Sequence, residues 1–418
     1  MNFERIEEIV RLHPKLVGVE DFELGWTETT ACARSFQNGR ERGETSDRSG
    51  WVTLRLLQRR QPGASIGVIR ESSDVNGLVE QALQASQLSS PDPWFRFPLW
   101  RSAAAAIPFP ELPPLEPIID ARPAKNLVVD ESVERWSSHH RLVRKSEKKS
   151  LECRVQGACG EVRLRLADRP SPVLSIVRKA APTGDYGLDP NFLPVFGDLA
   201  QAAALESAPQ GPFLLSSMAA SELVRLVSQG FVAGSPRFFV DEENACELSP
   251  LISLLDDGRH PKGVMIYPFD LEGVPTQRTV LVNRGRWEAR LCDTCAGGRY
   301  NQLSTGNWFR SPGEVWPRVH PTTFYLEAGE SRPQEMFSSL KSGTVLHSIE
   351  GLNWQEGGKA RLAGMGWTVH GAGQLKPHSR IEIEFKPLNA LRCVLAVGSD
   401  LEFYGSVGSP SILFKEMP

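Results

Sequence analysis

The C-terminal half of the chain consists of short runs of alternating apolar and polar residues, each broken by glycine or proline. Alternation with a period of two predicts strands buried on one face, and the glycines and prolines predict the turns between them. The runs are GVMIYPF, RTVLVNRG, TTFYLEAG, TVLHSIEG, RIEIEFKP and SILFKEM. Only SMAASELVRLVSQG and RPQEMFSSLKSG have helical spacing in this half. We therefore predict a β-rich domain over residues 211–418.

The first 88 residues mix the two periodicities. MNFERIEEIV has apolar residues at helical spacing, and WVTLRLL alternates as a strand does. Between them, Asn38-Gly39 is typical of a tight hairpin turn. VNGLVEQALQAS returns to helical spacing. Residues 1–88 are predicted to form an α+β domain: a helix, a small antiparallel meander and a closing helix.

The next two segments differ in composition. Nine prolines between residues 91 and 123 predict an extended linker over residues 89–123. ESVERWSSHHRLVRK then has a helical pattern, and LECRVQG and EVRLRLA alternate. The basic run RLVRKSEKKS could contact phosphate, but the acidic balance of the whole chain favours a solvated helix end or hairpin. We predict a central α+β domain over residues 124–210, and the fold class of the whole chain is α+β.

The length, net charge and cysteine content of the chain limit the partners and the cellular compartment that we expect. A length of 418 residues predicts two or three domains. With 47 basic and 50 acidic side chains, the net charge of -3 favours neither nucleic acid nor an anionic membrane surface. The N-terminus is not typical of a signal peptide, and no apolar run reaches the about 18 residues of a membrane span. Seven scattered cysteines fit a reducing compartment, so we expect a cytoplasmic protein.

CDTC, residues 292–295, places two cysteines at the spacing used by zinc sites and by thiol redox pairs. A tetrahedral zinc site needs two more ligands, whereas Cys246, His260 and His320 are isolated in the sequence. A redox pair would open a helix, whereas Ala-Gly-Gly follows Cys295. Neither chemistry is favoured for Cys292 and Cys295.

GASIG, residues 63–67, matches the Gly-x-Ser-x-Gly pattern and nominates Ser65 as a nucleophile. That pattern works at a sharp turn from a strand into a helix. Ser65 instead follows a Pro-Gly pair and precedes strand-like residues. We interpret it as a turn residue.

Two pairs of carboxylates are candidates for chemistry. Asp270 and Glu272 would share one face of an extended segment, close enough for a shared proton or a metal ion. Asp256 and Asp257 form the second pair. No histidine lies nearby in the sequence to complete a site, so the favoured interpretation is charged residues in a turn.

The motifs of the C-terminal half, taken in order, resemble the TldD/TldE (PmbA) metalloprotease family. The resemblance rests on FDLEGVPTQRTVLVNRG, LSTGN, FYLEAGE, KSGTVLHSIEG and VGSDLEFYGSVGSPSILF. ARSFQNGR and VNGLVEQALQAS are similar to the first domain of the family. The resemblance is weakest over residues 90–210. It nominates Asp270, Glu272, Thr305 and Asn307 as candidates for contact with peptide or with a partner subunit.

The resemblance implies two similar subunits, one of which carries His-Glu-x-x-x-His on a helix and a cysteine ligand near the end of the chain. Such a helix can hold zinc while its glutamate activates water. In this sequence Arg225, Leu226 and Gly230 stand at the corresponding places of SELVRLVSQGF. Residues 398–414 contain no cysteine, and Cys393 lies before them in a strand-like run. By the same comparison, Cys292 and Cys295 are expected to pack in or beside a strand.

Three functional hypotheses follow. The first is a TldE/PmbA-like subunit without catalytic or metal-binding residues or a cofactor of its own, which joins a TldD-like zinc-bearing subunit as a heterodimer or higher assembly. The resemblance implies that such an assembly processes unfolded peptides or the leader peptides of ribosomally made precursors. The second is a free-standing, zinc-independent enzyme of peptide or natural-product biosynthesis that uses Asp270, Glu272 or the two thiols. The third is a peptide-binding protein without enzymatic activity.

Overall fold

The structure is a computed structural model, and it describes most of the chain. The described residues are 2–100, 112–119, 127–147, 150–167, 174–179, 192–235, 247–264, 266–310, 316–371 and 373–417. Within them helices and several β-sheets are combined, which confirms the predicted α+β class. No helix of the described part is long and apolar enough to cross a membrane.

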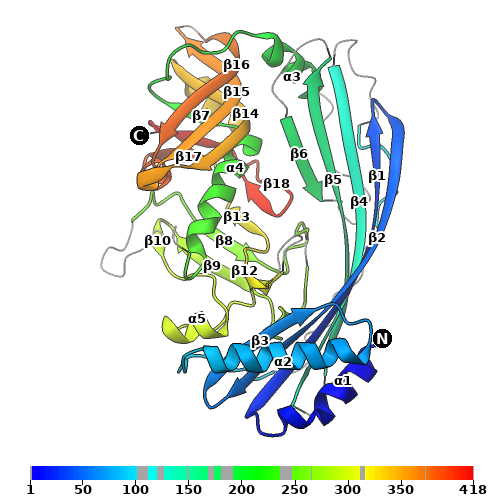
Figure 1. The fold of residues 1–418 in the computed structure, drawn as a ribbon. Coiled ribbons are helices and arrows are strands. Elements are labelled where there is room, and N and C mark those ends of the chain that lie inside the picture. Colours follow the sequence, from blue (N-terminus) through cyan, green and yellow to red (C-terminus); the bar gives the residue numbers. More distant parts are fainter. Residues whose placement is uncertain are drawn as a thin grey trace.

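A six-stranded antiparallel sheet dominates the N-terminal half, and its strands extend along most of the molecule (Figure 1). Its order is β3-β2-β1-β4-β5-β6. The elements of this half are α1 (Phe3–Leu12), the 3₁₀ helix η1 (Pro14–Leu16), β1 (Asp21–Gln37), β2 (Arg40–Gln58), β3 (Gln61–Gly67), α2 (Ser72–Leu88), β4 (Leu127–Arg144), β5 (Leu151–Leu166), β6 (Leu174–Lys179) and α3 (Phe192–Gln201). Helices α1 and α2 pack on one end of the sheet over a core that includes Phe3, Ile6, Leu24, Leu54 and Val79.

The predicted hairpin at Asn38-Gly39 is confirmed, because both residues have positive φ angles, 51° and 74°. The strands of the meander are longer than predicted. The turn joins strands of 17 and 19 residues, and β4 pairs with β1 along 15 residues, from Glu23 to Gln37. Strands of residues 1–88 and 124–210 therefore share one sheet, and the prediction of a separate central domain is wrong in this respect.

The helix predicted at ESVERWSSHHRLVRK is also wrong, because these residues form β4. Glu131 explains the error. Its side chain is buried, and its Oε2 accepts hydrogen bonds from the amides of Ile118 and Ile119, at 2.6 and 3.0 Å. A buried carboxylate among Val129 and Val133 breaks the apolar alternation of this strand. The hairpin interpretation of the basic run is confirmed by the antiparallel pairing of β4 with β5.

The C-terminal half contains two further six-stranded sheets, ordered β10-β9-β8-β13-β19-β18 and β16-β15-β14-β7-β20-β17, and a two-stranded pair of β11 and β12. Its strands are β7 (Phe213–Leu215), β8 (Leu254–Asp257), β9 (Arg278–Asn283), β10 (Arg286–Trp287), β11 (Trp308–Phe309), β12 (Arg318–Val319), β13 (Phe324–Leu326), β14 (Gly343–Trp354), β15 (Ala360–His370), β16 (Gln374–Phe385), β17 (Val394–Val397), β18 (Glu402–Tyr404), β19 (Val407–Ser409) and β20 (Ile412–Phe414). Its helices are α4 (Ser217–Ser228), η2 (Gln229–Phe231), α5 (Thr294–Arg299), α6 (Pro333–Ser339), η3 (Glu356–Gly358) and α7 (Pro387–Arg392). Helix α4 lies between the two larger sheets in the middle of the domain (Figure 1).

Most predictions for this half are confirmed, including both predicted helices and the strands β9, β13, β14, β16 and β20. The predicted strand GVMIYPF contains Met265, which lies outside the described residues. The rest of that run has no strand beyond an isolated bridge of Phe269 with Pro275. Cys393 caps α7 and does not lie in a strand, and α5 and α7 were not predicted. Both are six-residue helices, too short for the periodicity of a sequence to indicate.

The predicted linker packs between the two halves of the molecule where it is described. Residues 89–100 and 112–119 contain no helix or strand. Nevertheless, the indole Nε1 of Trp100 donates to the carbonyl of Glu272 at 3.2 Å, and Arg299 donates to the carboxylate of Asp92. The carbonyl of Pro98 accepts a hydrogen bond from Arg144. This part of the segment holds the N-terminal sheet against the C-terminal domain.

Candidate functional site

Helix α4 carries the positions at which the resemblance implies zinc ligands. The hydroxyl of Ser216 accepts a hydrogen bond from the amide of Ala219 at 3.2 Å and caps the helix. Leu226 is buried in the core of the C-terminal domain, and Gly230 lies in the 3₁₀ turn that follows the helix. Arg225 is part-exposed, and its Nη2 donates to the carbonyl of Tyr404 in β18 at 3.1 Å.

These residues do not fit a zinc ion. A guanidinium is cationic and offers no lone pair, leucine has no ligand atom, and glycine has no side chain. Among the described residues, no group of three or more histidine, cysteine, aspartate or glutamate side chains is placed to hold a metal ion. The helix therefore supplies neither a metal ligand nor a base for water at the three positions.

Asp270 and Glu272 lie in a tight turn, which agrees with the interpretation of charged residues in a turn, and they do not share a face of an extended strand. The amide of Asp270 donates to the carbonyl of Val274, and Gly273 has a φ of 77°. The carboxylate of Asp270 accepts hydrogen bonds from the amides of Glu272, Val274 and Trp308, at 2.9 to 3.1 Å. Burial and then repulsion from Glu272 raise the pKa of Asp270 well above its ordinary value. Asp270 holds the turn together.

Glu272 joins the C-terminal domain to the N-terminal sheet. Its Oε1 accepts a hydrogen bond from Arg55 of β2 at 2.8 Å. Its Oε2 accepts from the amide and the hydroxyl of Thr294, at 2.8 and 2.7 Å. Glu23 of β1 continues the network, since it pairs with Arg55 at 3.2 Å and with Arg144 of β4 at 2.6 Å. All four charged residues are at most 7% exposed, and two carboxylates balance two guanidinium groups.

Asn307 and Thr305 support the backbone from inside the domain. The side-chain amide nitrogen of Asn307 donates to the carboxylate of Asp256 at 2.7 Å. Thr322 donates to the same carboxylate through its backbone amide and its hydroxyl. The hydroxyl of Thr305 lies 3.0 Å from the amide of Cys292. Both predicted residues are 2% exposed. Neither is accessible to a peptide or a partner subunit in this conformation.

The two cysteines of CDTC lie at the start of α5, and not in or beside a strand as predicted. Asp293 caps this short helix, Cys292 precedes the cap, and Cys295 lies in the first turn. Burial raises the pKa of each thiol to about 12, which is opposite to the shift that a reactive thiol needs.

Ser65 does not lie in a turn, as was predicted. It lies in β3, is buried, and its hydroxyl donates to the carbonyl of Leu78 at 2.6 Å.

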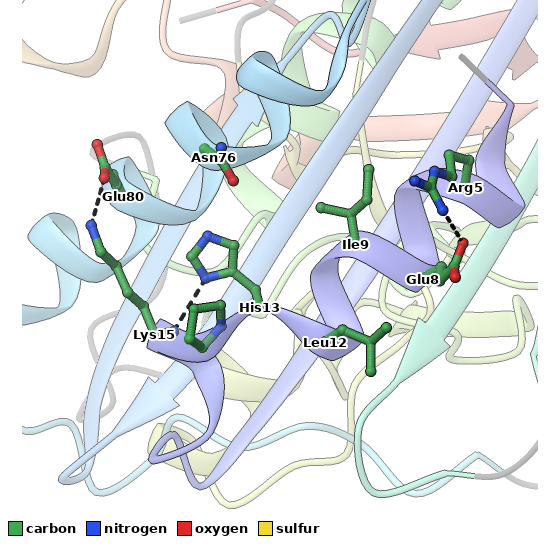
Figure 2. Close-up of a pocket in the computed structure, with 9 residues that line it drawn as sticks. Arg5, Glu8, Ile9, Leu12, His13, Lys15, Asn76 and Glu80 are labelled. Atoms are coloured by element: carbon green, nitrogen blue, oxygen red, sulfur yellow. Dashed lines mark hydrogen bonds and ion pairs between the residues drawn. The ribbon is translucent and has the colours of Figure 1, made fainter.

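Hollows with the size of a binding site occur at more than one place on the described surface. Figure 2 shows the first, of about 660 Å³, between α1 and α2, where Ile9, Leu12 and His13 lie between the ion pairs Arg5–Glu8 and Lys15–Glu80. The second, of about 740 Å³, lies beyond the C-terminal end of α4. Its lining includes Gln229, Val232, Asp293, Trp308 and His320.

The sequence did not indicate several residues that complete these clusters. Glu23, Arg55 and Arg144 alternate within strands as solvent-facing charges would, and only their common burial distinguishes them. Tyr404 was recognised only as part of a family motif. Its contact with Arg225 depends on two elements that lie 179 residues apart in the chain.

A titratable side chain in β14 gives a testable dependence of stability on pH. Burial raises the pKa of Glu350 to about 7, and Arg380, whose nitrogen is 3.9 Å away, offsets only part of this effect. The folded state therefore binds this proton more tightly than the unfolded chain, and the resulting stability is lost as the pH rises through about 7. We expect Glu350→Gln to raise the free energy of unfolding by about 1–3 kcal/mol at pH 8, and to change it little near pH 4, in denaturant titrations.

Glu382 of β16, in the same sheet, is the matched control. Hydrogen bonds from Arg361 and Arg380 lower its pKa, so its ionised form is favoured in the folded state. Glu382→Gln is not expected to stabilise the protein at pH 8. Equal effects of the two substitutions, or a gain from Glu350→Gln that does not change with pH, would contradict the assignment to Glu350.

Comparison with known proteins identifies the scaffold on which these residues lie. A family model described as the PmbA/TldA metallopeptidase C-terminal domain matches residues 210–418. The chain is 27% identical over 158 residues to a metalloprotease PmbA homolog of Buchnera aphidicola subsp. Baizongia pistaciae, which covers 37% of this chain and 33% of that protein. It is 29% identical over 182 residues to a metalloprotease TldD homolog of Haemophilus influenzae, and this match covers 38% of this chain and 37% of that protein. The matches span about a third of each curated relative.

The whole fold also has a solved counterpart. The crystal structure of TldE from Thermococcus kodakarensis superposes with a TM-score of 0.74 and covers 99% of both chains, at 18% sequence identity. At this identity the similarity shows a common fold. Since the family model covers half of the 418 residues, and its region contains α4 and the buried carboxylates Asp256, Asp270 and Glu272, the chain belongs to the PmbA/TldD family.

Proposed function

We propose that this chain is the subunit without a zinc site in a TldD/TldE-type peptidase assembly. The observation that carries the proposal is the chemistry of α4: in a family described as metallopeptidases, Arg225, Leu226 and Gly230 stand where the resemblance implies histidine, glutamate and histidine. The solved TldE is similar to the chain over its full length, which supports the choice of subunit. A subunit that has the fold of the family but not its zinc-binding and catalytic residues is suited to bind a partner subunit that has these residues.

The proposed partner is a TldD-like polypeptide that carries His-Glu-x-x-x-His, and the proposed contact is made by the C-terminal domain of this chain. The substrates would be unfolded peptides or the leader peptides of ribosomally made precursors. Extended peptides suit β-rich walls, because strand addition reads the backbone and not the side chains. We place this work in the cytoplasm, where the six described cysteines, all free, would stay reduced.

The structure disfavours the alternative of a zinc-independent enzyme built on the predicted residues. Asp270, Glu272 and Asn307 are occupied by hydrogen bonds inside the protein. The raised pKa values of Cys292 and Cys295 leave both thiols protonated at neutral pH. The groups named for that alternative thus have structural partners.

The test is a peptidase assay with an unstructured peptide and three samples: this chain, a TldD-like partner, and both together. Cleavage that requires zinc is expected only where the partner is present, and its rate and the oligomeric state of the partner should change when this chain is added. Metal-dependent cleavage by this chain alone would refute the proposal. So would a partner whose rate and elution volume in size-exclusion chromatography are the same with and without this chain.

A further inference from the structure

The part-exposed face of α4 is directed at the C-terminal end of the chain. Eight of its twelve residues are buried. Met218, Glu222 and Arg225, which are part-exposed, are spaced four and three residues apart and so form one stripe along the helix. Strand β18 packs against this helix and also lies beside β6 of the N-terminal sheet. In Figure 1, β18 lies between α4 and β6.

β18 is an edge strand in the described structure. Its sheet ends at this strand, which pairs with β19 on one side only. Tyr404 pairs with Val407 across the hairpin, and Arg225 adds a donor from α4, because its Nη2 donates to the carbonyl of Tyr404 at 3.1 Å.

The side chain of Tyr404 is held by the same helix. Its hydroxyl lies 3.2 Å from the hydroxyl of Ser217 and donates to the carboxylate of Glu402 at 3.0 Å. Ser217 and Arg225 are separated by eight residues, or about two turns of the helix. The backbone and the ring of one residue are therefore fixed from two points of α4.

We infer that Ser217, Arg225, Glu402 and Tyr404 form a metal-independent clasp between α4 and the β18–β19 hairpin. The inference rests on the proposed absence of a zinc site. The resemblance implies that zinc-bearing relatives join this helix to a cysteine near the end of the chain, and residues 402–409 belong to that end. In this chain hydrogen bonds join the same two elements, and they set the position of the edge strand that faces β6.

The clasp is tested by hydrogen–deuterium exchange on the isolated, full-length chain. Arg225→Met keeps most of the aliphatic length and removes the donor. We expect the amides of residues 402–409 to exchange roughly tenfold faster in this variant, as for the loss of one hydrogen bond, and those of α2 to be unchanged. Arg361→Met, the same substitution at an exposed arginine of β15 that pairs with Glu382, is the matched control and should leave residues 402–409 unchanged. Adding a metal chelator should leave the hydrogen–deuterium exchange of every segment of the wild-type protein unchanged.

Two results would overturn the inference. One is unchanged exchange of residues 402–409 in Arg225→Met, and the other is faster exchange there in the wild-type protein after chelation. If Arg225→Met does not fold, Tyr404→Phe provides the test, because it removes one hydroxyl and leaves the carbonyl acceptor. It should accelerate exchange in the same residues by a few-fold, and no acceleration would again overturn the clasp. Because no partner is added, this outcome is independent of the peptidase assay: failure of that assay alone would count against the proposed subunit role and not against the clasp.

Discussion

Replacing Glu272 with leucine is expected to lower the free energy of unfolding by about 3–5 kcal/mol, because it leaves a buried charge without its partner. Arg55 would lose its 2.8 Å hydrogen bond, and the amide and hydroxyl of Thr294 would lose their acceptor. Glu23 could compensate only in part, since it already pairs with Arg144 at 2.6 Å. The measurement is chemical denaturation followed by circular dichroism.

The exposed Glu288→Gln is the control in the same domain, and a change below about 0.5 kcal/mol is expected. The double variant Arg55→Met with Glu272→Leu removes one charge of each sign and leaves the pair of Glu23 with Arg144. It should be less destabilised than the sum of the two single variants by about 1–3 kcal/mol. Additive single effects would show that the two side chains do not interact as the structure indicates.

Replacing Asp256 with alanine is expected to lower the free energy of unfolding by about 2–4 kcal/mol, because three buried donors lose one acceptor. The donors are the amide group of Asn307 and the amide and hydroxyl of Thr322. These bonds join β8 to the segments that precede β11 and β13. Thermal unfolding and denaturant titration of the variant provide the measurement.

Asp257→Ala is the matched control, because the neighbouring carboxylate is part-exposed and accepts from the amide of Arg259 at a turn. We expect it to cost less than about 1 kcal/mol. A similar loss in both variants would mean that Asp256 has no special place in the core. Such a result would remove the structural role assigned here to Asn307 as well.

Local sequence patterns predicted those elements whose causes are local. The Asn38-Gly39 turn follows from the positive φ angles that both residues tolerate, and SMAASELVRLVSQG formed α4 because its apolar spacing is regular. β4 was missed because its buried face includes the polar residues Glu131 and His140. Their burial depends on amides and rings supplied by other segments, which no window of a few residues contains.

The sequence by itself determined the family, through motifs that keep their order. It also determined that Arg225, Leu226 and Gly230 offer no zinc ligand, because the chemistry of a side chain needs no coordinates. Tertiary structure alone decided what the candidate residues do. Arg55 and Glu272 are 217 residues apart, and Asn307 and Asp256 are 51 apart, so no periodicity could connect them. The sequence shows the same carboxylate whether its side chain binds a substrate or accepts hydrogen bonds from buried donors of the protein. Only the positions of those donors assign Asp256, Asp270 and Glu272 to the scaffold.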